Sequence, residues 1–188
     1  KISSSLKRKS KKILILNNNQ DIINRSDWVF LAVTPEVGHK MLPELKFKKN
    51  KTVISFISTI KMKELKKYTN MKSKIFRAIP LPPISIRKWP IPLYPPNKSV
   101  KNFFDHLGTT VEIENENLSL NLWSTSSMMA PFYELLNTLS IWLNQKGINK
   151  SDSQKYITSL FIALSEYTKI NWKTDLKFLV KKAQTQKG

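Results

Sequence analysis

The clearest hydrophobic pattern is the apolar run from Trp28 to Val33, which stops abruptly at Thr34-Pro35-Glu36. An unbroken apolar run is typical of a strand buried on both faces of a parallel sheet. Thr34 can cap a helix, Pro35 suits its first turn and Glu36 suits its positive end. The pattern therefore predicts strand, tight turn and helix. Ligands of open α/β sheets bind at the carboxyl ends of such strands, although an ordinary turn without a ligand is an equal alternative.

The rest of the first half repeats this alternation of short apolar runs and helical stretches. The patterns predict strands over 13–16, 52–57 and 74–79, and helices over 20–25, 36–42 and 61–68. Residues 1–5 could end a further strand. Alternating strands and helices indicate an α/β fold with a doubly wound sheet. The proline-rich stretch 80–96 predicts an extended crossing segment with an edge strand at 91–94, and neither a helix nor a central strand.

The second half is predicted to be mainly helical, with the domain boundary near Asn97. We expect a helix over 99–107 capped by Gly108, a short strand over 109–113, and a long helix that Gly147 ends. The next helix has a capping box of Ser151 and Gln154, and Thr174 is placed to cap the last helix, over 175–182. The apolar stripes of these helices can pack in the core of one subunit, against a second subunit, or against a further C-terminal region.

Composition narrows the class of protein. The formal charge is +19, but all except four of the 32 basic residues are scattered lysines, and no nucleic-acid-binding module is recognisable. We therefore expect no nucleic-acid partner. The absence of cysteine and the presence of only two histidines argue against a metal site. No apolar run approaches the ~20 residues that span a bilayer, and no signal-peptide pattern is present, so we expect no membrane partner and a cytoplasmic location.

The basic run from Lys7 to Lys12 has two interpretations. A charge run is usually a solvated face. In a dinucleotide-binding fold, however, the turn after the second strand meets the adenosine ribose, where an acidic residue selects NAD and basic groups accept the 2′-phosphate of NADP. Ser5, Lys7 and Arg8 stand there without an acidic residue. If the fold is of this type, NADP(H) is the expected cofactor.

The ordered motifs resemble those of the pyrroline-5-carboxylate reductase family. The segment from Asp27 to Pro35 is similar to the family's Asp-Val-Val-Phe-Leu-Ala-Val-Lys-Pro, and Asn19 stands eight residues earlier, where the family has a ribose-contacting Asn. Further similarities lie at Ser5-Leu6-Lys7, Val53-Ile54-Ser55, Arg77-Ala78-Ile79-Pro80, Gly108 and Gly147-Ile148. The resemblance covers essentially the whole chain, beginning at the family's second strand.

The resemblance implies an NADP-binding domain over 1–97 with an incomplete Rossmann-type doubly wound sheet, whose first βα unit is missing. It implies a helical dimerisation and substrate domain over 98–188 that is truncated at its C-terminal end. It implies hydride transfer from NADPH to the C=N carbon of a small imino acid, pyrroline-5-carboxylate, in a homodimer or higher homo-oligomer, and hence a role in proline biosynthesis. Ser5, Lys7 and Arg8 would hold the 2′-phosphate. The other implied cofactor contacts are Asn19, Ala32, Val33, Thr34, Pro35 and Ser58. Ser126 and Ser127 are candidates for the substrate carboxylate, with simple helix capping as the alternative; no residue is assigned as proton donor.

Three departures from the family pattern matter. The four glycines form no GxGxxG motif, so the chain as given should bind the dinucleotide poorly and is expected to be an inactive fragment. Leu81 replaces the Asn after Met-Pro, and Ser124 to Pro131 replaces the family's Gly-Ser-Gly-Pro-Ala. The end from Thr185 to Gly188 looks like a loop cut in the middle. The alternatives are therefore a reductase of another small imino or oxo acid, and a non-catalytic nucleotide-binding or dimerising protein.

Overall fold

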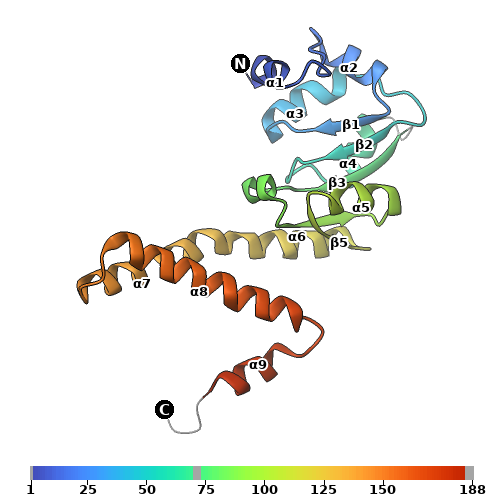
Figure 1. Ribbon diagram of the computed structural model, residues 1–188. Coiled ribbons are helices and arrows are strands. Elements are labelled where there is room, and N and C mark those ends of the chain that lie inside the picture. Colours follow the sequence, from blue (N-terminus) through green and yellow to red (C-terminus); the bar gives the residue numbers. More distant parts are fainter. Residues whose placement is uncertain (1, 70–72, 185–188) are drawn as a thin grey trace. The chain divides into compact units, whose positions relative to one another are not determined.

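The computed structural model describes residues 2–69 and 73–184, and the chain divides into two compact units, one ending at Thr125 and the other beginning at Ser126. The predicted strand end at 1–5 falls partly on residue 1, and the predicted loop at 185–188 falls wholly outside the described residues. Figure 1 shows the sheet and its helices in the first unit and a set of helices in the second.

The first unit is built on one mixed sheet with the strand order β1-β2-β3-β4-β5. The first three strands run parallel, β4 runs antiparallel to β3, and β5 runs parallel to β4. The strands are β1 (Trp28–Leu31), β2 (Thr52–Ser55), β3 (Lys74–Ala78), β4 (Trp89–Tyr94) and β5 (Gly108–Glu112). The parallel strands β1 to β3 confirm the predicted Rossmann-type sheet.

Helices cover both faces of this sheet, as in a doubly wound fold (Figure 1). One face packs Val29, Val53 and Ile75 against α2 and α4, and the other packs Ile54 and Phe76 against α5. These residues alternate along their strands, as a two-residue period requires. The helical segments of this unit are α1 (Ile2–Lys9), α2 (Asn19–Arg25), α3 (Pro35–Met41), η1 (Leu42–Glu44), α4 (Met62–Tyr68), η2 (Pro82–Ile86), α5 (Lys98–Asp105) and α6 (Glu116–Thr125).

Two N-terminal predictions are wrong. Residues 2–9 form helix α1 instead of a strand end, and residues 13–16 form no strand. Leu14 and Ile15 are exposed, so the apolar run at 13–16 has no sheet neighbour to pair with in the described chain. Strand β1 also differs from the expectation of burial on both faces, because Phe30 is 38% exposed. Among the described strands β1 is an edge, and an edge strand is less completely covered.

The proline-rich segment contains a central strand, contrary to prediction. Strand β4 lies between β3 and β5 although it includes Pro90 and Pro92. The carbonyl of Leu93 accepts a hydrogen bond from the amide of Ile113, so the backbone polar groups of Leu93 point toward β5. Because these groups alternate in direction along a strand, the backbone nitrogens of Pro90 and Pro92 point toward β3. Pairing with β3 covers only Leu93 and Tyr94, so the prolines interrupt no ladder bond there.

Residues 98–125 belong to the first unit, where they pack with the sheet. Strand β5 pairs with β4 along its whole length, and α6, which the sequence analysis does not predict, contacts β4. Gly108 begins β5 and is not a helix cap; its backbone pairs with Trp89. The compact units therefore divide after Thr125, whereas the functional division at Asn97 stays a prediction.

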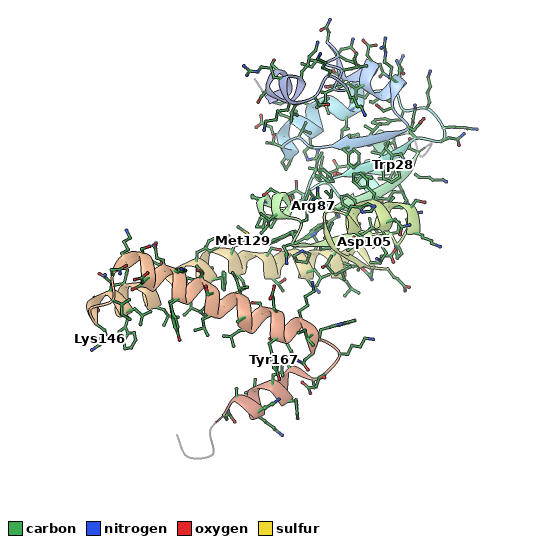
Figure 2. The ribbon with its side chains drawn as sticks, viewed as in Figure 1. Trp28, Arg87, Asp105, Met129, Lys146 and Tyr167 are labelled. Carbon is green, nitrogen blue, oxygen red and sulfur yellow. The ribbon has the colours of Figure 1, made fainter. Side chains whose placement is uncertain are left out.

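The second unit consists of η3 (Ser126–Met128), α7 (Met129–Gln145), α8 (Lys150–Ile170) and α9 (Leu176–Ala183). Gly147, with a φ of 96°, ends α7 as predicted, because an L side chain rarely adopts that backbone conformation. The predicted caps of the next two helices are wrong: the side chain of Asn149 caps α8 and that of Asp175 caps α9. Figure 2 shows the side chains of the second unit projecting along its helices.

None of the helices within residues 2–69 and 73–184 is both long and apolar enough to cross a membrane.

Acid is expected to weaken the junction of α5 and β5 through Asp105, which Figure 2 labels. Hydrogen bonds from Lys101 and from Thr110 lower the pKa of the Asp105 carboxyl. A folded-state pKa below the unfolded value stabilises the fold at neutral pH, and that contribution disappears as pH falls through the folded pKa. The free energy of unfolding, measured in urea from pH 7 downwards, should decline less steeply below pH ~4 in Asp105→Asn than in the unmodified protein. Glu114→Gln, which removes an exposed carboxylate, is the control and should have the same pH dependence as the unmodified protein. The same pH dependence in Asp105→Asn as well would contradict the prediction.

Candidate functional site

The turn after β1 has the predicted geometry at the carboxyl edge of the parallel strands. Thr34 precedes α3, and its hydroxyl accepts a hydrogen bond from the amide of Val37 at 3.5 Å. Pro35 is the first residue of the helix and Glu36 lies in its first turn. The predicted cap, proline position and acidic residue are confirmed, and they place the start of α3 beside the end of β1.

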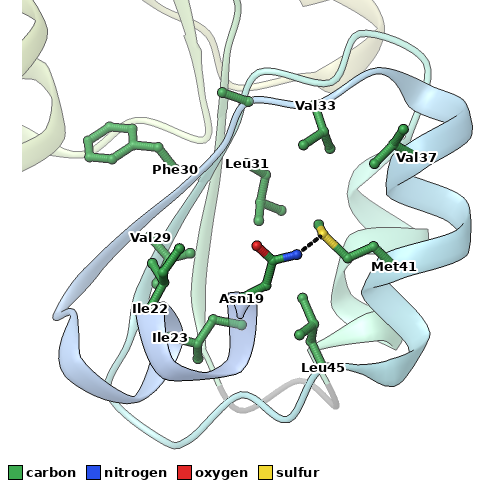
Figure 3. Close-up of a pocket in the computed structure, with 11 residues that line it drawn as sticks. Asn19, Ile22, Ile23, Val29, Phe30, Leu31, Val33, Val37, Met41 and Leu45 are labelled. Atoms are coloured by element: carbon green, nitrogen blue, oxygen red, sulfur yellow. Dashed lines mark hydrogen bonds between the residues drawn. The ribbon is translucent and has the colours of Figure 1, made fainter. Parts of the chain in front are cut away.

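A pocket of about 200 Å³ lies beside β1, between α2 and α3 (Figure 3). Its lining is almost entirely apolar. Asn19 contributes the polar side chain, and its Nδ2 atom lies 2.8 Å from the sulfur of Met41. The lining residues are Asn19, Ile22, Ile23, Val29, Phe30, Leu31, Ala32, Val33, Val37, Met41 and Leu45.

The pocket brings together three of the predicted cofactor residues, Asn19, Ala32 and Val33. Thr34 and Pro35 follow directly in the chain at the start of α3. The volume is below the ~300–1,000 Å³ usual for ligand sites, so the pocket is too small to enclose a whole dinucleotide.

The remaining predicted cofactor residues stand outside the pocket lining. Ser58 is exposed in the loop after β2, at the same carboxyl edge as Thr34. Ser5 is half-buried, and Lys7 and Arg8 are exposed in the last turns of α1. Helix α1 thus presents the basic side chains to solvent, where they are able to meet an anion, and its described sequence contains no acidic residue.

Ser126 and Ser127 belong to the second unit, in the 3₁₀ helix η3. They lie between α6 and α7, and the residue that caps α7 is Met128, whose side chain makes no capping bond. Neither serine therefore stands at the N-cap position of α7, and helix capping stays an untested alternative for both. Their role toward a substrate carboxylate stays a prediction.

A buried charge network, which the sequence analysis misses, lies behind the β2–α4 loop. Arg77 on β3 is fully buried; its Nη1 pairs with Glu116 of α6, and its Nη2 donates to the carbonyl of Ser58 at 2.7 Å. The same Glu116 oxygen accepts from the amide of Met62 at 2.7 Å. The guanidinium carbon lies 4.8 Å from the centre of the Trp123 ring, a cation–π arrangement. The ion pair of Arg77 and Glu116 therefore joins β3 and α6 to Ser58 in the loop and to the start of α4.

The electrostatics of this network combine a desolvation penalty with an incomplete set of hydrogen bonds. Burial lowers the pKa of the Arg77 guanidinium, and the nearby Glu116 carboxylate opposes that shift. In the described structure, Arg77 Nε and Trp123 Nε1 are buried donors without a hydrogen-bond partner. A sequence signal for Arg77 exists, since a charged residue in an otherwise apolar strand needs a buried partner. No signal identifies Glu116, 39 residues further along the chain.

A second polar cluster joins α3 to α4 on the surface. The hydroxyl of Tyr68 donates to Glu64 at 2.7 Å, and Nδ1 of His39 lies 3.1 Å from that hydroxyl and 3.2 Å from Glu64. The hydrogen bond to Glu64 raises the pKa of Tyr68. Within the described residues no group of three or more His, Asp or Glu side chains is placed to hold a metal ion. The cluster acts as a tie between two helices.

Comparison with known proteins adds a sequence match over the first third of the chain. Residues 2–59 match the family described as NADP oxidoreductase coenzyme F420-dependent. All nine predicted cofactor residues, from Ser5 to Ser58, lie within the matched region. No curated protein sequence matches the chain.

Solved structures match nearly the whole chain. The 1-pyrroline-5-carboxylate reductase of Streptococcus pyogenes is 18% identical, with a TM-score of 0.80 over 98% of this chain and 73% of that chain. The pyrroline-5-carboxylate reductase of Coxiella burnetii is 19% identical, with a TM-score of 0.82 over 98% and 72%. The pyrroline carboxylate reductase of Plasmodium falciparum, solved with NADP bound, is 17% identical, with a TM-score of 0.77 over 92% and 69%. The chain therefore has the fold of the pyrroline-5-carboxylate reductases, and its first 59 residues carry the sequence match to an NADP oxidoreductase family.

Proposed function

We propose that this protein is an NADPH-dependent reductase of a cyclic imine, converting 1-pyrroline-5-carboxylate to proline. The observation that carries the proposal is the agreement of fold along 98% of the chain with two such reductases. The match of residues 2–59 to an NADP oxidoreductase family supports the cofactor independently of the fold. The choice of pyrroline-5-carboxylate as the substrate is based on the resemblance of fold and motifs.

The arrangement at the carboxyl edge of β1 and β2 suits a dinucleotide. The pocket beside Asn19 fits a ring-sized part of the cofactor, with Ala32 and Val33 lining it and the start of α3 beside it. The exposed basic groups of α1 suit the 2′-phosphate, since a cation forms charge-assisted hydrogen bonds with it. Ser58 stands at the end of the neighbouring strand, where the nicotinamide half would approach.

Bound NADPH would supply the hydride, which forms a C–H bond at the imine carbon while the C=N π pair moves to nitrogen and takes a proton. The chain's own task is to hold the two reactants in register and to receive the substrate carboxylate. Ser126 and Ser127 are proposed for that carboxylate.

The direct test is oxidation of NADPH with pyrroline-5-carboxylate by the purified full-length protein, because residues 1–188 contain no GxGxxG loop and are expected by themselves to bind the dinucleotide poorly. Formation of proline with one NADPH consumed per imine supports the proposal. Leu81 and the segment from Ser124 to Met129 differ from the family pattern, so a panel of other imino and 2-oxo acids is the necessary control. Turnover of an oxo acid alone would replace the proposed substrate, and NADPH binding without turnover of any panel member would favour a non-catalytic nucleotide-binding protein.

Removing the basic groups of α1 is expected to weaken NADPH binding selectively. The double variant Lys7→Ala with Arg8→Ala should raise the Kd for NADPH about 10-fold, because each hydrogen bond to a charged group contributes about 1.5–3 kcal/mol, less at an exposed site. The Kd for NADH should stay unchanged, since NADH lacks the 2′-phosphate. Fluorescence titration measures both. Lys155→Ala, at an exposed lysine of α8, is the control; an equal loss of affinity for both nucleotides would argue against a 2′-phosphate site.

We also propose that the second unit associates with a second copy of this chain. Helices α7 to α9 and the turn between α8 and α9 leave large apolar side chains exposed, among them Tyr156 at 63%, Ile170 at 82% and Trp172 at 70%. Apolar exposure on this scale marks an interaction surface, and the 17- and 21-residue lengths of α7 and α8 suit helix-on-helix packing between copies. Sedimentation equilibrium should show a dimer or larger assembly that Ile162→Lys weakens and Lys155→Ala does not. A monomer at all concentrations would refute the proposal.

A further inference from the structure

The β2–α4 loop, residues 56–61, is held at Ser58 and at the start of α4 by side chains that come from elsewhere in the fold. Its Ser58 carbonyl accepts a 2.7 Å hydrogen bond from Nη2 of Arg77, which belongs to β3. The amide of Met62, the first residue of α4, donates a 2.7 Å hydrogen bond to the Glu116 carboxylate of α6. Because Arg77 and Glu116 also pair with each other, the two anchors form one unit.

Helix α4 depends on this distant carboxylate for its start. The residue before it, Lys61, provides no side-chain capping bond. The first amides of a helix lack internal partners and favour a negative charge. Glu116, 54 residues further along the chain than Met62, supplies both the acceptor and the charge. The orientation of α4 is thereby tied to the beginning of α6.

We infer that Arg77 and Glu116 are positioning residues for nucleotide binding: they fix the β2–α4 loop at the carboxyl end of β2, so that Ser58 meets the cofactor in a preformed geometry. This inference rests on the proposed function. A preformed loop binds more tightly because the ordering is complete before the ligand arrives. Neither residue touches the nucleotide in this arrangement; both act through the loop.

The pair is poorly suited to a role in stability alone. Arg77 is removed from water completely, and its Nε donor has no partner in the described structure; neither has Nε1 of the neighbouring Trp123. Replacing a buried ion pair by apolar residues of similar volume is often neutral or stabilising. What an apolar pair cannot reproduce is the hydrogen bond to the Ser58 carbonyl and the acceptor for Met62. Fold stability and loop geometry are therefore separable by mutation.

The test compares the double variant Arg77→Met with Glu116→Leu against a matched pair, Arg25→Met with Glu114→Leu, which makes the same chemical changes at exposed positions. Three quantities are measured on each protein: the thermal unfolding midpoint, the hydrogen-exchange rate of the Met62 amide relative to amides of β2, and the Kd for NADPH. We expect the buried double variant to keep its unfolding midpoint within a few degrees. Its Met62 amide should exchange at least ~10-fold faster and its Kd should rise ~10-fold, a loss of about 1.4 kcal/mol. The control pair should match the unmodified protein in all three.

If the double variant fails to fold, the single variant Arg77→Lys provides the test in its place. A lysine ammonium keeps the charge beside Glu116 but lacks the planar fork that reaches two acceptors at once. We expect this variant to fold, to keep the Met62 amide protected by Glu116, and to bind NADPH several-fold more weakly through the loss of the Ser58 contact.

The outcomes separate this inference from the proposed function. If the unmodified protein binds NADPH and the folded variants bind it equally well, the inference is overturned and the proposed function stands. Unchanged exchange at Met62 in the double variant also overturns it, because the loop is then held by other contacts. If the unmodified protein binds no NADPH, the proposed function fails and the inference fails with it.

Discussion

Replacing Glu116 alone by leucine is expected to lower the free energy of unfolding by about 3–5 kcal/mol, the usual loss when one partner of a buried ion pair is removed. The remaining Arg77 is fully buried, and without Glu116 its guanidinium keeps the Ser58 carbonyl as its hydrogen-bond acceptor but has no counter-charge. Burial already lowers the pKa of Arg77, and Glu116 is the group that opposes this shift most strongly. Urea denaturation followed by tryptophan fluorescence measures the change.

The control for this prediction is Glu114→Leu, which removes an exposed carboxylate from the same connection between β5 and α6. It should change the free energy of unfolding by less than about 0.5 kcal/mol. Adding Arg77→Met to Glu116→Leu should restore most of the lost stability, since the uncompensated charge is then gone. If Glu116→Leu lowers the free energy of unfolding by less than about 1 kcal/mol, the prediction is wrong. Water then reaches Arg77 after the substitution, and its charge is not left buried without a partner.

The sheet of the first unit follows closely from the hydrophobic pattern. Strands β1, β2 and β3 and the helices between them lie where the hydrophobic pattern predicts. Thr34 and Pro35 specify the start of α3 from local chemistry alone, so this junction is readable without knowledge of the remaining fold. Patterns of this kind are informative because the strand, the turn and the helix each depend on residues within a few positions.

The wrong strand predictions and the missed helix share a dependence on distant partners. The run at 13–16 has strand composition, but a strand forms only where a neighbour supplies hydrogen bonds, and no described strand lies beside it. Strand β4 tolerates its prolines because pairing with β3 covers only two residues. Helix α6 has weak amphipathic periodicity, and its packing against β4 could not be inferred from local sequence.

The candidate site divides in the same way. Asn19, Ala32 and Val33 were predicted from motifs, and the structure brings them to one pocket. The network of Arg77 and Glu116 was missed, because an ion pair between residues 39 positions apart depends on how α6 returns over the sheet. The residues that line the pocket are thus more readily predicted from the sequence than the residues that hold the loop behind it.

A methyl group at position 108 is expected to lower the free energy of unfolding by about 3 kcal/mol, at the upper end of the usual effect of overpacking. In Gly108→Ala the new Cβ would lie 2.1 Å from the carbonyl oxygen of Trp89, far inside van der Waals contact. The obstacle is backbone, so no side-chain rotation relieves it. Strands β4 and β5 would have to separate at the pair Trp89 and Gly108, where their parallel ladder begins.

Gly147 provides the matched control because a substitution there is strained for a different reason. A Cβ at Gly147 meets nothing within 4 Å, but the φ of 96° is unfavourable for alanine, so Gly147→Ala should lower the free energy of unfolding by about 1–2 kcal/mol. Asparagine tolerates positive φ, so Gly147→Asn should be milder than Gly147→Ala, whereas Gly108→Asn should be at least as damaging as Gly108→Ala. Urea unfolding of the four variants gives the comparison. If asparagine also rescued position 108, backbone conformation and not the contact with Trp89 would be the reason for glycine there, and the close approach of β4 and β5 would be wrong.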